Sequence, residues 1–178
     1  WSAFWPMDRV RELSQMGRLL TANANIMIRT LLLVFAFSYF TNEAAKFGVI
    51  SLAATHIVLQ IMAFTAFFLD GFAYVAESQT GRSYGARDER AFKLAMHRTT
   101  VLAGAAALIL ALVIMLLGGS LVALLTDIDE VIASSAALLP ICAVYVIASF
   151  PAFQLDGVFI GTSRTQEMRN ASLVSLLV

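Results

Sequence analysis

The fold is decided by residues 67–88, which read FFLDGFAYVAESQTGRSYGARD. This stretch places Asp70 and Glu77 in an otherwise apolar run and ends in a segment rich in arginine. At helical spacing Asp70, Tyr74, Glu77 and Gly81 fall on one face, so they predict a polar stripe on an apolar helix. Such a stripe faces protein or water rather than lipid, and acids inside membrane helices are candidates for a functional role.

The composition of the whole chain indicates an integral membrane protein. Of the 178 residues, 60% are hydrophobic and only 13% are charged, and the mean hydropathy is +0.81. These values are far too apolar for a soluble domain of this length. The formal net charge of zero gives no indication of a nucleic-acid partner. Cys142 is the only cysteine, so it has no disulfide partner within the chain and we interpret it as a packing residue.

Four apolar runs are long enough to cross a hydrocarbon core of about 30 Å. They lie at about residues 19–40, 49–79, 99–117 and 131–163, and a fifth run begins near the end of the sequence. We therefore expect an all-α polytopic membrane bundle with four complete transmembrane helices and the start of a fifth, belonging to a longer protein. The bundle is assigned to residues 19–178.

Residues 1–18 form a separate amino-terminal segment in this interpretation. Trp1, Phe4 and Trp5 stand before a stretch that mixes apolar residues with arginines. This pattern predicts an amphipathic cytoplasmic lead that lies on the membrane surface. A solvated linker remains the alternative.

The connections between the runs also have sequence signals. We expect a polar turn at residues 42–48, a basic loop at residues 81–98, and a helix break at Gly118-Gly119 before an acidic loop. Small residues of the third run predict close helix packing: Thr100, Gly104, Ala107 and Ala111. Pro140 and Pro151 each remove a backbone hydrogen bond, so they predict kinks in the fourth helix, one of them close to Asp156.

The distribution of basic residues predicts the orientation in the membrane. The amino-terminal segment, the 81–98 segment and residues 164–169 together hold ten of the twelve lysines and arginines. The turns on the other side hold only Lys46, and Arg29 lies within the first spanning run. The positive-inside rule therefore places the amino terminus and both basic connections in the cytoplasm.

A short internal repeat links the second and fourth spanning runs. Leu-Asp-Gly occurs at residues 69–71 and again at residues 155–157. Both runs cross in the same direction under the predicted topology, so we interpret the two hairpins as duplicates in parallel orientation. Internal repeats of this kind are frequent in secondary transporters.

One cation and three acids lie within the predicted membrane helices, namely Arg29, Asp70, Glu77 and Asp156. A cluster with excess negative charge suits the binding of a proton, a sodium ion or an organic cation. The alternative is a structural ion pair between Arg29 and one acid. We expect Asp70 to be this fixed partner and Asp156, beside Pro151, to be the movable acid. Glu77 alternatively extends to the membrane interface.

The sequence does not favour an enzyme. Asp70 and Asp156 lack the Tyr-Asp and Gly-x-Gly-Asp contexts of intramembrane aspartic proteases, and we find no Gly-rich phosphate loop or Gly-x-Ser-x-Gly elbow. His56 and His97 have no partners at the spacing of metal ligands. We therefore expect no catalytic residue, no resident metal and no cofactor.

Three segments resemble the multidrug and toxic compound extrusion (MATE) family, specifically its DNA-damage-inducible-F-like branch. They are LDGFAYVAESQTGRSYGARD at residues 69–88, AFQLDGVFIGTSRTQEMRNASLVSLLV at residues 152–178, and NIMIRTLLL at residues 25–33, in which Arg29 matches an arginine early in the seventh helix of the branch. The resemblance extends over nearly the whole chain. The helices match helices seven to ten and the start of helix eleven.

The resemblance implies half of a two-lobed, twelve-helix antiporter of the bacterial inner membrane, which exports cationic or amphipathic compounds in exchange for protons or sodium ions. The implied partners are the amino-terminal lobe, the lipid bilayer and a small organic cation. In the sodium-coupled branch this lobe carries a glutamate in helix seven and an aspartate in helix ten. Asp156 looks like that aspartate, whereas Arg29 lies close to the position of the glutamate. The alternatives are a non-transporting membrane scaffold subunit and a lipid-linked sugar flippase of the same superfamily.

Overall fold

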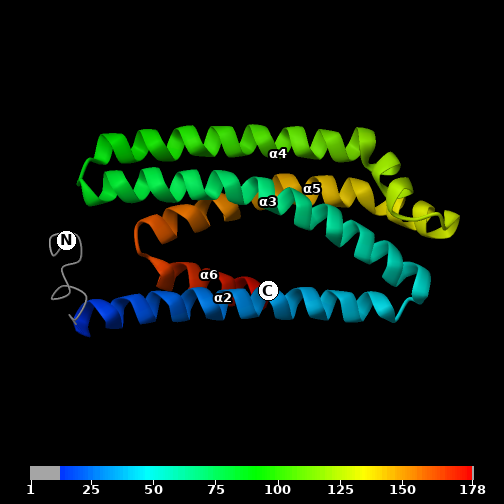
Figure 1. The fold of residues 1–178 in the computed structure, drawn as a ribbon, viewed down its shortest axis with the longest axis horizontal. Helices are drawn as coiled ribbons and strands as arrows, with labels where there is room; N and C mark the ends of the chain where they lie inside the picture. The colour runs from blue at the N-terminus through cyan, green and yellow to red at the C-terminus, as the bar shows by residue number, and fades with distance from the viewer. Residues whose placement is uncertain (1–12, 178) are drawn as a thin grey trace, which may run out of the picture.

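The computed structural model describes residues 13–177, which form five helices, labelled α2 to α6 in Figure 1. These are α2 (Leu13–Ala45), α3 (Val49–Gly85), α4 (Glu89–Leu125), α5 (Asp129–Gly161) and α6 (Thr165–Leu177). The all-α architecture predicted from the sequence is confirmed. The expected lead at residues 1–18 falls outside the described residues up to position 12, and from Leu13 onward it is part of α2.

Four of the helices are long and apolar enough to cross a membrane, as the sequence predicted. At about 1.5 Å per residue, the 37 residues of α4 extend for about 55 Å. This length exceeds a hydrocarbon core of about 30 Å, so the ends of α4 lie outside the core or the helix is tilted. The long helices and the apolar surface make this an integral membrane protein.

The helices extend farther than the sequence predicted, and the connections are correspondingly shorter. The expected basic loop at residues 81–98 is wrong, because α3 continues to Gly85 and α4 begins at Glu89. Its arginines stand instead on the polar ends of two helices, except Arg87, which lies in the short connection between them. The turn after α2 is likewise limited to residues 46–48. Charged residues indicate where the chain leaves the apolar core. They do not indicate where a helix ends, because a helix that projects into water keeps its backbone hydrogen bonds.

The expected helix break at Gly118-Gly119 is also wrong, because α4 continues to Leu125. Gly118 is buried against Leu139 of α5, and a Cβ atom at this glycine would lie 2.8 Å from a Leu139 methyl carbon. The glycine therefore gives room to a neighbouring side chain. Helix-breaking residues are tolerated in apolar surroundings, where an unpaired backbone group has no water to bind.

The helices α3, α4 and α5 pack together into the core of the bundle, and α2 and α6 form a second pair beside them (Figure 1). The core residues are mostly aliphatic or small. Ala107 and Ala111 of the predicted small-residue stripe on α4 are both buried in it. Pro140 and Pro151 lie inside α5, which remains helical through both positions. The kinks that these prolines predict stay predictions.

Candidate functional site

The site is built on a very close crossing of α3 and α5. A Cβ atom added to Gly157 would collide with the backbone carbonyl of Ala73, and one added to Gly161 would collide with the carbonyl of Glu77. Gly81 in turn lies under Gly161, where a Cβ atom would be 2.8 Å from the Gly161 carbonyl oxygen. Two helix backbones can approach this closely only where no side chain separates them. This crossing fixes the neighbouring acids of both helices relative to each other.

The crossing also sets the depth of the two Leu-Asp-Gly copies. Ala73 of α3 lies opposite Gly157 of α5, and Glu77 lies opposite Gly161. The two helices therefore run parallel, and this register places Asp70 and Asp156 about two residues apart in depth, or about 3 Å along the helix axis. The two copies therefore lie at similar depth on two helices that run in the same direction.

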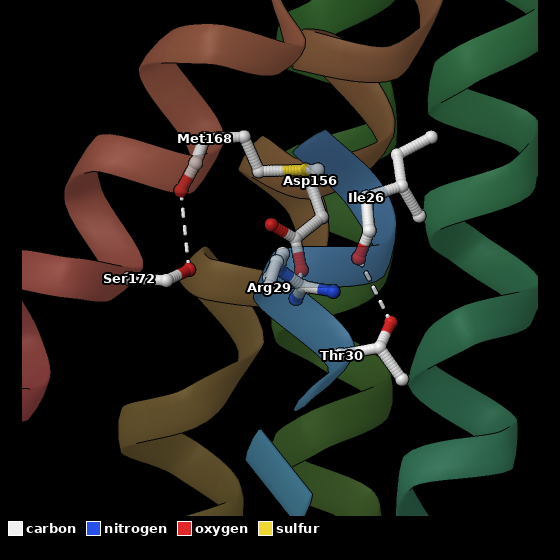
Figure 2. A network of polar contacts seen from close by, with 6 residues as sticks. All are labelled: Ile26, Arg29, Thr30, Asp156, Met168 and Ser172. Atoms are coloured by element: carbon white, nitrogen blue, oxygen red, sulfur yellow. Dashed lines mark hydrogen bonds and ion pairs between the residues drawn. The ribbon is translucent and has the colours of Figure 1, made fainter. Parts of the chain in front are cut away.

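Arg29 of α2 forms an ion pair with Asp156 of α5. Figure 2 shows the guanidinium group and the carboxylate pointing toward each other from the two helices. The Arg29 and Asp156 side chains are 22% and 20% exposed, so the pair is neither fully buried nor freely solvated. Among the residues whose side chains are described, it is the one ion pair between different helices. The pair connects α2 to the packed unit of α3, α4 and α5.

The expectation that Arg29 pairs with Asp70 is wrong, because Arg29 pairs with Asp156. Asp70 is half-buried and attracts Arg29 electrostatically, but it makes no hydrogen bond or salt bridge with any residue whose side chain is described. The pairing depends on how α2 is rotated about its axis in the folded bundle. Residue spacing along α3 gives the face on which Asp70 lies, but it does not give the rotation of α2, which decides the acid that Arg29 reaches.

The other predicted residues of the polar stripe lie apart from the ion pair. Glu77 is half-buried and makes no side-chain hydrogen bond or salt bridge among the described residues. Tyr74 is exposed at 69% of its surface. No three His, Cys, Asp or Glu side chains of residues 13–177 gather as metal ligands. Of the predicted polar stripe, only Asp70 therefore interacts with Arg29, and it does so electrostatically.

A second polar contact, which the sequence did not predict, joins α2 to α6. The buried side-chain amide of Asn25 donates to the Thr165 hydroxyl at 3.3 Å, and its oxygen accepts from the Arg169 guanidinium at 2.9 Å. Asn25 lies one helical turn before Arg29, so both use the same face of α2. That shared face was visible in the sequence, but the partners on α6 were not.

A third polar contact, between α4 and α5, was also missed. The Gln154 amide donates to the Thr99 hydroxyl at 2.6 Å, and both side chains are buried. The Gln154 Oε1 atom has no hydrogen-bond partner in the described part of the chain. No residue spacing indicated this contact, because it joins positions 55 residues apart.

The described helices are held together in two different ways. The α3–α5 crossing is held by backbone contact, whereas α2 is held to α5 and α6 by side-chain polar contacts. A carboxylate paired with an internal cation can exchange that cation for a proton or for another cation. Asp156 is the acid of the described bundle that forms such a pair between two helices.

Comparison with known proteins identifies the family. The MatE family model matches residues 24–178. The chain is 34% identical over 158 residues to the DNA damage-inducible protein F of Escherichia coli (strain K12), and this match covers 89% of the chain. It covers 34% of that relative, so the chain spans about a third of the length of the curated protein that it matches. Because the family match extends over most of the chain, and the fold consists of apolar spanning helices, the protein belongs to the MatE family of membrane transporters.

Proposed function

We propose that this chain is part of an ion-coupled antiporter that exports organic cations or amphipathic compounds, and that Asp156 takes part in coupling. The observation that carries the proposal is the half-buried ion pair between Arg29 and Asp156. Ionisable residues within membrane helices pair with each other and mark ion or proton pathways. The family membership supports transport as the activity to which such a group contributes.

The nature of the Arg29–Asp156 pair favours protons over sodium ions as the coupling ion. An arginine remains charged throughout the physiological pH range, so Arg29 already supplies Asp156 with a positive partner. A sodium ion would have to displace this guanidinium. A proton instead neutralises the carboxylate and releases Arg29, and Asp70 is then the acid that continues to attract it.

The exposure of the pair speaks against a purely structural scaffold. A scaffold predicts that Arg29, Asp70 and Asp156 are all paired and shielded from solvent. Arg29 and Asp156 are instead each about one-fifth exposed, and Asp70 has no ion-pair partner among residues 13–177. An acid without a partner among the described residues, as Asp70 is, remains available to a proton or another cation, which a scaffold does not require.

Transport by the protein as its gene encodes it, reconstituted in proteoliposomes, tests this proposal. A pH gradient and a sodium gradient are imposed separately, and ethidium movement is followed by fluorescence. We expect the pH gradient alone to drive transport and Asp156→Asn to abolish it. Asp127→Asn is the matched control, because Asp127 is exposed in the α4–α5 connection. Transport driven by sodium alone, or normal transport by Asp156→Asn, contradicts the proposed coupling.

We further propose that the end of the bundle with the α3–α4 and α5–α6 connections faces the cytoplasm of a bacterial inner membrane. The basic residues of these connections support this orientation. Single cysteines at Ala86 and Ser163 are suitable probes because both positions are exposed, whereas Ser83 is buried. In a variant without the buried Cys142, we expect both to react from the cytoplasmic side and Asp127→Cys to react from outside. The opposite labelling pattern contradicts the orientation.

A further inference from the structure

A pocket of about 760 Å³ lies at the basic end of the bundle, between the α3–α4 connection and the end of α5. We call it the basic-end pocket. Its apolar wall comes from Tyr84, Phe92, Val158 and Phe159. Its charged residues come from the two connections and the start of α4: Arg87, Asp88, Glu89 and Arg164. It is separate from the Arg29–Asp156 pair, neither of which lines it.

The charges in this pocket are not equally available to a ligand. The Asp88 carboxylate accepts the backbone N–H of Ala91 at 2.9 Å and thereby caps α4. The Glu89 carboxylate pairs with Lys93 of the same helix at 2.6 Å. Arg87 and Arg164 make no ion pair with any residue from 13 to 177. The two acids are thus already engaged, whereas the two guanidinium groups have no acidic partner among the described residues.

The two arginines are placed by connections of the same geometry. Arg87 and Ser163 are the two non-glycine residues with positive φ in the described chain, at 55° and 59°. In each connection the backbone N–H that follows this residue bonds five residues back, from Asp88 to Ser83 and from Arg164 to Phe159. Side-chain-bearing residues adopt this conformation infrequently. The two connections therefore have the same turn geometry, and each places one arginine at the rim of the pocket.

We propose that the basic-end pocket binds the phosphate group of an anionic phospholipid. The guanidinium group matches phosphate geometry and forms charge-assisted hydrogen bonds with it. The apolar wall of Phe92, Val158 and Phe159 suits the glycerol and upper acyl region. Basic pockets between membrane helices on the cytoplasmic side are suited to anionic headgroups. The proposal goes beyond the transport function, and it uses the cytoplasmic orientation proposed above.

The free soluble phosphate of the cytoplasm is the competing source of the same chemistry. A lipid is favoured because the pocket combines its arginines with an aromatic and aliphatic wall, which inorganic phosphate does not use. Long arginine side chains also extend along apolar surface toward the headgroup region. A phospholipid contacts both parts of the pocket, its phosphate group the arginines and its acyl region the apolar wall.

Lipid binding to the purified protein as its gene encodes it tests this assignment. The probe is phosphatidylglycerol in phosphatidylcholine nanodiscs, and the readouts are thermal stability and the lipids retained in native mass spectrometry. The test variant is Arg87→Gln with Arg164→Gln. The matched control is Arg90→Gln with Arg98→Gln, which removes the same charge from exposed residues that do not line the pocket. We expect the test variant to bind phosphatidylglycerol at least about tenfold more weakly, since each lost charge-assisted contact reduces affinity by about this factor.

Several outcomes overturn the proposal. One is equal binding of phosphatidylglycerol and phosphatidylcholine by the unmodified protein, and another is equal weakening in the test and control variants. Competition by millimolar inorganic phosphate or glycerol phosphate would identify a soluble ligand instead. If the test variant does not fold, a photoreactive phosphatidylglycerol on the unmodified protein decides the matter: crosslinks at residues 83–92 and 158–164 support the site, and crosslinks elsewhere contradict it. None of these readouts depends on transport.

Discussion

The α3–α5 crossing and the attachment of α2 show two different ways of holding membrane helices together. At the crossing, Gly157 and Gly161 let two backbones touch, and no side chain stands between them. Between α2 and its neighbours, the described contacts that fix orientation are polar, namely Arg29 with Asp156 and Asn25 with Thr165 and Arg169. Backbone contact cannot be changed by a proton, whereas a paired carboxylate can. We therefore expect movement within the described bundle at α2 and not at the crossing.

The largest expected effect concerns the crossing. In Gly157→Ala, the new methyl group would collide with the Ala73 carbonyl, and backbone cannot move aside as a flexible side chain does. We expect a loss of about 3 kcal/mol in the free energy of unfolding, the upper part of the usual range for overpacking. The measurement is the denaturation midpoint of the purified protein in detergent.

The control for this change is Gly71→Ala. It lies in the same pair of helices, and a Cβ atom there would have no neighbour within 4 Å. This variant should match or slightly exceed the stability of the unmodified protein, because alanine favours the helix by up to about 1 kcal/mol. Similar losses in both variants would show that the crossing is not specially tight.

The next effect concerns the polar connection. Arg29→Met leaves Asp156 without its counter-charge, and we expect a loss of about 2 kcal/mol. This is less than the roughly 3–5 kcal/mol of a fully buried pair, because both side chains are partly exposed. Lys46→Met, which breaks the exposed pair with Glu43, should cost at most about 1 kcal/mol. Thermal denaturation of the two variants gives the comparison.

Variants of the two acids show which of them is the partner of Arg29. Asp156→Asn should lower stability about as much as Arg29→Met, and Asp70→Asn should lower it less than half as much. Combining Arg29→Met with Asp156→Asn should cost less than the sum of the two, since each removes the same pair. A larger loss in Asp70→Asn than in Asp156→Asn would show that Asp70 is the partner of Arg29 in the membrane.

A smaller effect is expected where α2 meets α6. Asn25→Ala removes the two hydrogen bonds to Thr165 and Arg169, and it should cost about 1 kcal/mol. Asn23→Ala is the control, because Asn23 is exposed and its change should alter the denaturation midpoint little. Equal effects of the two changes would remove Asn25 from the set of contacts that orient α2.

The smallest effect tests whether every buried polar contact orients a helix. The Gln154–Thr99 contact lies inside the tightly packed unit, and one of its oxygens is unsatisfied. Gln154→Met combined with Thr99→Val keeps the shape and removes both polar groups, so stability should change by less than about 0.5 kcal/mol. A loss well above this value would mean that the packed unit also depends on polar contacts.

The sequence predicted most of the fold because membrane burial leaves a strong signal. Four apolar runs and the buried positions Ala107 and Ala111 were evident from hydrophobicity and helical spacing. The helix ends were not, because the exposed ends of α3 and α4 carry charge without losing their helical hydrogen bonds. Gly118 was misread as a break because only the packed structure reveals Leu139 beside it.

The site was predictable only in part. Spacing identified Arg29, Asp70 and Asp156 as membrane-embedded charges, but it could not select the pair, which depends on the rotation of α2 about its axis. The motif Gly157-x-x-x-Gly161 was present in the sequence and is a known signal for close helix packing. Its position directly after Asp156 would have indicated that this acid belongs to a rigid crossing.

The sequence separation of Arg29 and Asp156, 127 residues, has a consequence for the order of assembly during synthesis. At about 5–20 residues per second, α2 waits roughly 6 to 25 seconds before its ionic partner leaves the ribosome. The glycine crossing also needs α5, so neither interface can close until this helix is made. The helices α3 and α4 can pack against each other before then, whereas the ion pair and the glycine crossing form only when α5 enters the membrane, and the contacts of Asn25 wait for α6. Protease sensitivity of nascent chains truncated before and after α5 measures this step, and equal sensitivity of the two would show that assembly does not wait for α5.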